Sequence, residues 1–106
     1  MIVISRFRVS ADDALAFRGD AERAQVALAD RPGYLRGTLG RNLDDPTLWS
    51  MVTQWENVGC YRRALSAYDV KLNAVPLLSR AIDEPSAYES VHAGAELNVE
   101  QTRSLD

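Results

Sequence analysis

The chain has few of the side chains that metal and redox chemistry require. It contains one cysteine, Cys60, which cannot form an internal disulfide, and this is typical of a reducing compartment such as the cytoplasm. Its one histidine, His92, stands alone, whereas a structural zinc site usually draws several cysteine and histidine ligands. We therefore expect a cytoplasmic protein that holds no metal and no haem.

Long apolar runs, an excess of positive charge and a phosphate-binding glycine pattern are also absent. No apolar run approaches the roughly 20 residues that cross a bilayer, so a membrane partner is not expected. The formal net charge is −3, whereas a nucleic-acid-binding protein needs a basic face to displace counterions from phosphates. The glycines at 33, 37 and 40 do not follow G-x-G-x-x-G, which argues against a flavin or nicotinamide cofactor.

The remaining composition is ordinary for one globular domain. The chain of 106 residues is 46% hydrophobic and 25% charged, which allows a substantial core but not two domains. We expect the folded domain to span residues 1–92. The tail, residues 93–106, is polar and aperiodic, and is expected to be flexible.

The first half of the chain predicts a strand, a helix and a hairpin. Residues 2–9 alternate between two faces, as in a strand with one side buried. The helix that follows should end at the "RPG" of residues 31–33, because proline and glycine do not continue a helix readily. Residues 34–41 and 48–55 are predicted strands, and the turn-forming "NLDDPT" between them indicates an antiparallel hairpin.

The second half predicts a helix, short helical pieces and a last strand. Asn57 can cap a helix whose apolar stripe consists of Val58, Tyr61, Leu65 and Tyr68. Pro76 interrupts the helical pattern, so residues 69–82 should form short pieces, and residues 86–92 a short strand.

This order of elements is the split βαβ arrangement, an α+β ferredoxin-like fold. It predicts a four-stranded antiparallel sheet with the helices on one face. The other face would carry Ile2, Ile4, Leu48 and Val52, and a half-apolar sheet face without helices usually meets another protein surface. A homodimer, sheet against sheet, would cover it most simply.

Four segments carry a resemblance to a known family. They are "VISRFRV", "RPGYLRGTL", "RNLDDPTLWSMVTQWENVGCYRRAL" and "DEPSAYE", with Trp55-Glu56 closing the third predicted strand. Together they resemble the antibiotic-biosynthesis monooxygenase family of the dimeric α/β-barrel superfamily. The resemblance implies a dimeric α/β barrel, and reactions that range across the family from quinone formation to haem degradation.

The resemblance assigns catalytic roles to two residues. Trp55 matches the tryptophan that ends the third strand in quinone-forming members, and Tyr61 matches the tyrosine of the following helix. Those members also carry an asparagine four residues before the tryptophan, and that position is Met51 here. A methionine can line a pocket but lacks the amide that hydrogen-bonds a substrate, so this position departs from the pattern of the quinone-forming members.

We expect the ligand to lie between the sheet and the second helix. The predicted substrate-binding residues are Ser5, Phe7, Trp49, Met51, Thr53, Leu65 and Tyr68. Their polar tips, with the Trp55 indole and the Tyr61 hydroxyl, need partners when buried, and a bound phenol could supply them. The alternative interpretation is that the aromatic residues only fill the core.

Two functions remain open at this point. The first is a cofactor-independent monooxygenase acting on an electron-rich aromatic or polyketide-type molecule, which once deprotonated can pass electrons directly to oxygen. The second is a dimeric protein of the same fold that binds a hydrophobic small molecule without turnover, and Met51 favours it.

Overall fold

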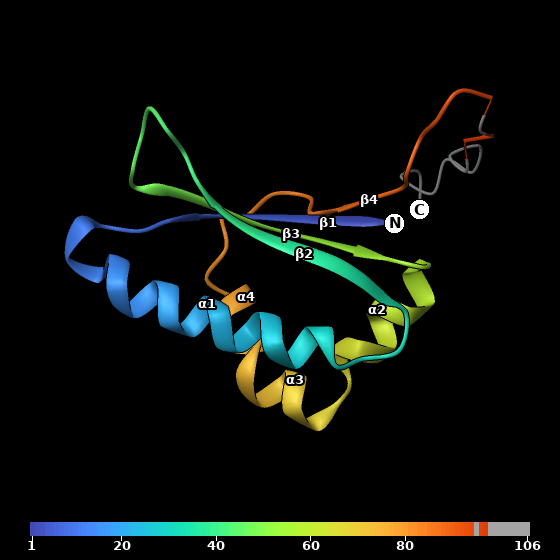
Figure 1. The fold of residues 1–106 in the computed structure, drawn as a ribbon, viewed down its shortest axis with the longest axis horizontal. Coiled ribbons are helices and arrows are strands. Elements are labelled where there is room, and N and C mark those ends of the chain that lie inside the picture. Colours follow the sequence, from blue (N-terminus) through green and yellow to red (C-terminus); the bar gives the residue numbers. More distant parts are fainter. Residues whose placement is uncertain (95, 98–106) are drawn as a thin grey trace.

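The structure is a computed structural model that describes residues 1–94 and 96–97 (Figure 1). Of the tail predicted to be flexible, residues 95 and 98–106 lie outside the described residues. The described chain forms an antiparallel sheet with helices over one of its faces (Figure 1). In chain order the elements are β1 (Ile2–Arg8), the short 3-10 helix η1 (Ala11–Asp13), α1 (Ala14–Ala29), β2 (Tyr34–Arg41), β3 (Leu48–Trp55), α2 (Val58–Leu65), α3 (Tyr68–Asn73), α4 (Val75–Leu78) and β4 (Ala87–Tyr88).

The sheet has the strand order β2-β3-β1-β4, and every neighbouring pair is antiparallel. β1 pairs with β3 along its whole length, from Ile2 opposite Gln54 to Arg8 opposite Leu48. The hairpin predicted between β2 and β3 is present, with a register irregularity near Tyr34. The predicted ferredoxin-like α+β fold is therefore confirmed.

Alternation along the two central strands separates a core face from an open face. Val3, Ser5 and Phe7 of β1 are buried beneath the helices, as the sequence pattern predicts. The residues between them, such as Ile2 and Ile4, are only partly covered, and β3 repeats this pattern over its eight residues. The sheet therefore presents a second face, which no described helix covers (Figure 1).

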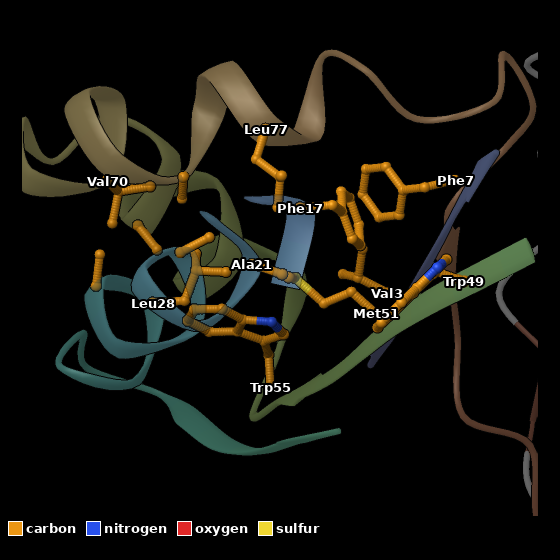
Figure 2. Packing of buried hydrophobic residues seen from close by; sticks show 14 of the residues in the cluster. Val3, Phe7, Phe17, Ala21, Leu28, Trp49, Met51, Trp55, Val70 and Leu77 are labelled. Atoms are coloured by element: carbon orange, nitrogen blue, oxygen red, sulfur yellow. The ribbon is translucent and has the colours of Figure 1, made fainter. Parts of the chain in front are cut away.

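Helix α1 supplies much of the helical side of the core. Its buried residues include Phe17, Ala21, Ala24 and Leu28, a spacing that places them on one helix face. The two alanines are fully buried, and their small side chains let the helix backbone approach its neighbours closely. Figure 2 shows this cluster packed against side chains from β1 and β3.

The single helical stripe predicted from Val58 to Tyr68 is wrong. Asn57 caps α2 as expected, its side-chain oxygen accepting from the Cys60 N–H at 2.9 Å, but the helix ends at Leu65. Ala67 then adopts an extended backbone (φ −71°, ψ 144°), and Tyr68 starts a new helix on a different axis. Tyr68 is therefore 76% exposed.

The last strand is shorter than the predicted 86–92. Only Ala87 and Tyr88 are in β4, opposite Val3 and Ile2 of β1. Pro85 has no N–H to offer the strand beside it, which shortens the ladder on the side that precedes β4. This shortened pairing leaves part of the β1 edge open.

Candidate functional site

A cleft of about 500 Å³ lies beside the open edge of β1. This volume is in the range of small-molecule sites, which usually combine apolar walls with a few polar groups. The walls come from Ile4 and Ser5 of β1, from α2 and α4, and from the chain that follows α4. The lining residues beyond β1 are Tyr61, Leu65, Val75, Leu78, Ser79, Ala81, Ile82, Asp83, Glu84 and Ser86.

The cleft exists because the chain bulges away from β1 before β4 begins. The Ile4 N–H donates to the Ser86 carbonyl oxygen at 2.7 Å, and the Ile82 N–H donates to the Arg6 carbonyl oxygen at 2.8 Å. Between these two anchors β1 has one residue, Ser5, while the opposite segment has three, residues 83–85. The extra length must loop outward, as at a β-bulge, and space opens over the edge at Ser5.

Tyr61 reaches the cleft from α2 and carries a hydroxyl available to a ligand. Its ring lies against Trp55 with the centroids 5.5 Å apart. Burial raises the pKa of the Tyr61 hydroxyl above its usual 10.0, because the phenolate would lose water, so the group keeps its proton at neutral pH. Within the described part of the chain this hydroxyl has no hydrogen-bond partner, which leaves it able to donate to a bound oxygen atom.

Trp55 lies behind Tyr61 and not at the cleft wall. It is 1% exposed, and its indole Nε1 donates to the Thr53 hydroxyl at 2.9 Å. Tyr34 packs edge-on against the same indole, at 5.2 Å between centroids. The Trp55 N–H and the Thr53 hydroxyl were both expected to face a ligand, but they hydrogen-bond to one another inside the core. Trp55 can position the Tyr61 ring, but its N–H is already used.

The remaining predicted ligand contacts divide between the cleft and the core. Ser5 and Leu65 line the cleft with Tyr61. Phe7 and Trp49 instead pack around Phe17, at 5.0 and 5.3 Å between ring centroids, and Met51 is 2% exposed (Figure 2). None of these core residues lines the cleft, so the alternative interpretation, that they fill the core, describes their packing.

Tyr68 and its neighbours face away from the cleft. Tyr68 is absent from the lining because α2 ends before it. Asp69 and Asn73 line a separate groove of about 850 Å³ between α1 and α3. Sequence reasoning missed the wall formed by α4 and the segment after it, for which Pro85 was the one local signal.

Charge at the cleft is concentrated in residues 83–85, the bulged segment between the two hydrogen bonds to β1. The Arg6 guanidinium donates to both oxygens of Glu84, with Nε and Nη2 each at 2.7 Å. These hydrogen bonds hold the pKa of Glu84 below its usual 4.5 and raise that of Arg6. Over residues 1–94 and 96–97, no group of three or more His, Cys, Asp or Glu side chains is arranged to hold a metal ion.

The helices of the described chain are also too short or too polar to span a membrane. This finding agrees with the lack of a long apolar run in the sequence.

Comparisons with known proteins agree with this fold. SnoaB of Streptomyces nogalater, described as a cofactor-independent oxygenase, is 24% identical with a TM-score of 0.73, over 90% of this chain and 96% of that one. A variant of SnoaB is 25% identical with a TM-score of 0.68, over 92% and 95% of the two chains. A conserved protein of Methanosarcina mazei Go1 is 17% identical with a TM-score of 0.66, over 81% and 84%.

Among curated proteins no relative matches the chain. A family model does match it, over residues 1–71, which include β1, the β2–β3 hairpin, Trp55 and Tyr61. That model is described as antibiotic biosynthesis monooxygenase. Because it covers well over half of the sequence and agrees with the observed topology, the chain belongs to the antibiotic biosynthesis monooxygenase family.

Proposed function

We propose that the protein is a cofactor-independent monooxygenase that oxidises an electron-rich aromatic or polyketide-type molecule. The observation that carries this proposal is Tyr61, which lines a cleft of about 500 Å³ and whose hydroxyl has no hydrogen-bond partner in the described chain. The description of SnoaB as a cofactor-independent oxygenase supports it, as does membership of the same family.

The reaction needs no reductant beyond the substrate. In a hydroxylated anthrone, loss of a proton from the methylene carbon of the central ring gives an anion that can pass electrons to oxygen. The methylene carbon takes one oxygen atom to become a carbonyl, and its two hydrogens leave with the other oxygen atom as water. The protein then has to bind the ring, favour the anion and exclude bulk water.

The cleft residues suit these tasks. Leu65, Val75 and Leu78 supply an apolar surface for a fused ring system. Tyr61, which keeps its proton at neutral pH, can donate to the oxygen on which the anionic charge develops. Trp55 packs behind that ring and fixes its position, so its role is support and not contact.

Oxygen uptake with dithranol, a hydroxylated anthrone, tests the proposal. We expect uptake above the rate without protein, and one atom of isotopically labelled oxygen in the quinone product by mass spectrometry. Denatured protein is the control for background autoxidation. A rate equal to that control, across several phenols and anthrones, would reject the proposed reaction.

A second function, binding without turnover, has its own support. Met51 is buried in the core and has no amide, while the Trp55 N–H is bonded to Thr53. The cleft therefore lacks two hydrogen-bonding groups expected from the resemblance to quinone-forming members. Calorimetric binding of an aromatic ligand without oxygen uptake would select this alternative.

We also propose a homodimer that joins through the open sheet faces and so forms a dimeric α/β barrel. Ile2, Ile4, Leu48 and Val52 are partly exposed on that face, and no described helix covers them. Apolar faces of this kind are usually covered by another protein surface. We propose a cytoplasmic location as well, because the one cysteine forms no disulfide in the structure.

A further inference from the structure

The cleft has acidic groups in its walls and no basic ones. Its two ionisable carboxylates are Asp83 and Glu84, both in the bulged segment between α4 and β4. No arginine, lysine or histidine is among the described residues that line it. An anion entering this cleft would therefore find no positive side chain in its walls.

One of these two carboxylates, that of Glu84, is already paired with an arginine. Arg6 lies on β1 and binds both oxygens of Glu84, at 2.7 Å each. This bidentate pair neutralises Glu84 and uses the donors of the guanidinium that face it. Arg6 is also absent from the cleft lining, so it places no positive side chain inside the cleft. With Glu84 paired, Asp83 is the carboxylate in the cleft lining that has no ion-pair partner in the described chain.

Both chain neighbours of Asp83 are fixed in place. Ile82 donates its N–H to the Arg6 carbonyl oxygen at 2.8 Å, and Glu84 is held by the Arg6 side chain. Asp83 lies between these anchors, so its backbone is constrained at the mouth of the cleft although its side chain is exposed to solvent. A charge held at a pocket entrance acts on every ligand that binds there.

We infer that this cleft selects aromatic ligands that carry no negative charge, and that Asp83 is the residue that sets this preference. The inference rests on the proposed assignment of the cleft as the ligand site, and it names the class of substrate. A phenol or anthrone that enters the cleft neutral satisfies it, and the anion formed later in the proposed reaction is stabilised by the Tyr61 hydroxyl. The same ring system with a carboxylate substituent would meet Asp83 without a counter-ion.

Two matched probes test the inference. Aloe-emodin and rhein are dihydroxyanthraquinones that differ in carrying a hydroxymethyl group or a carboxylate, and neither has a methylene left to oxidise in the central ring. We expect aloe-emodin to bind about fivefold or more tightly than rhein in calorimetry at low ionic strength, and added salt to narrow that ratio.

Variants at Asp83 assign the effect to one side chain. Asp83→Asn should reduce the preference about threefold, because it removes the charge and keeps the shape, while Asp83→Glu should retain it. Asp44→Asn removes one charge from the exposed β2–β3 loop, outside the cleft lining, and should leave the preference unchanged.

Each other outcome overturns the inference. Equal affinity for the two probes, tighter binding of rhein, an unchanged ratio in Asp83→Asn, or no binding of aloe-emodin would all contradict it. Failure of the proposed reaction gives a different result, because charge selection would persist in binding while oxygen uptake with dithranol stayed at background.

Discussion

At the residue scale, the Tyr61 hydroxyl should contribute to ligand binding and little to stability. Tyr61→Phe keeps the ring against Trp55 and removes a hydroxyl that has no partner in the described chain. We expect the affinity for aloe-emodin to fall about fivefold to tenfold, the loss of one neutral hydrogen bond. The melting temperature should stay the same or rise slightly, since a half-buried polar group without a partner is lost. A lower melting temperature with unchanged affinity would make Tyr61 structural.

Trp55 and Thr53 should show the opposite behaviour. Thr53→Val removes the acceptor of the 2.9 Å bond and leaves the buried indole N–H unpaired, which typically costs about 1–3 kcal/mol of unfolding free energy. Trp55→Phe should also destabilise, because it opens a cavity behind Tyr61. Denaturant unfolding of both single variants and the double variant measures the coupling between them. A coupling energy near zero would contradict the shared hydrogen bond.

At the element scale, Gly33 fixes the turn from α1 into β2. Its φ of +88° is costly for other residues, and a Cβ there would collide with Cys60 of α2. We expect Gly33→Ala to lower the unfolding free energy by about 2 kcal/mol or more, since backbone strain and overpacking act together. Gly19→Ala, inside α1, where a Cβ would only touch the Arg23 guanidinium at 3.7 Å, is the matched control and should stabilise by about 0.5–1 kcal/mol. Similar effects at both positions would contradict this account of the turn.

The bulged segment should loosen in acid through Glu84. Arg6 holds the folded-state pKa of Glu84 below 4.5, so the pair stabilises fully above that value and is lost as the pH falls through the lowered pKa. The melting temperature of Glu84→Gln should therefore fall below that of the unchanged protein near neutral pH. This difference should narrow as the pH falls below 4.5, and vanish once the carboxylate is protonated in the folded as well as the unfolded chain. If the difference in melting temperature between the two proteins did not change with pH, the contribution of the Arg6 contact would not depend on the charge of the Glu84 carboxylate.

The elements themselves were largely predictable from local patterns. Alternation along β1 and β3 follows from one buried face, and Asn57 marks the start of α2 by its capping oxygen. The end of α2 was not predictable, because neither Ser66 nor Ala67 is a helix breaker. Packing of α3 against α1 accompanies the extended backbone at Ala67.

The site was less predictable than the fold for a physical reason. Tyr61 could be found from its helix position and from the family resemblance. The wall around residues 79–86 has no periodic pattern, and its place depends on hydrogen bonds to β1 that are distant in sequence. The Thr53–Trp55 bond was within reach of sequence reasoning, because residues two apart on a strand share a face.

At the scale of the whole molecule, the fold leaves one sheet face without helices, and this asymmetry determines the expected assembly. Val52 lies near the middle of that face, on β3 opposite Ile4 of β1. Two such faces packed together should bury on the order of 2,000 Å² or more in total, as stable dimers do. Sedimentation velocity at micromolar concentration should therefore show a dimer.

A charged substitution can locate the interface on the sheet. Val52→Arg places an unpaired charge where the two sheets would meet, so we expect the dimer to dissociate or weaken by at least tenfold in its dissociation constant. Val26→Arg is the control, because Val26 is 72% exposed on α1, on the helical side of the molecule. That variant should sediment as a dimer. A monomer in the unchanged protein would defeat the proposed assembly, and a dimer insensitive to Val52→Arg would move the interface to another face. Because Ile4 lies on this face and also lines the cleft, loss of the dimer should weaken aloe-emodin binding too, in parallel with the sedimentation change.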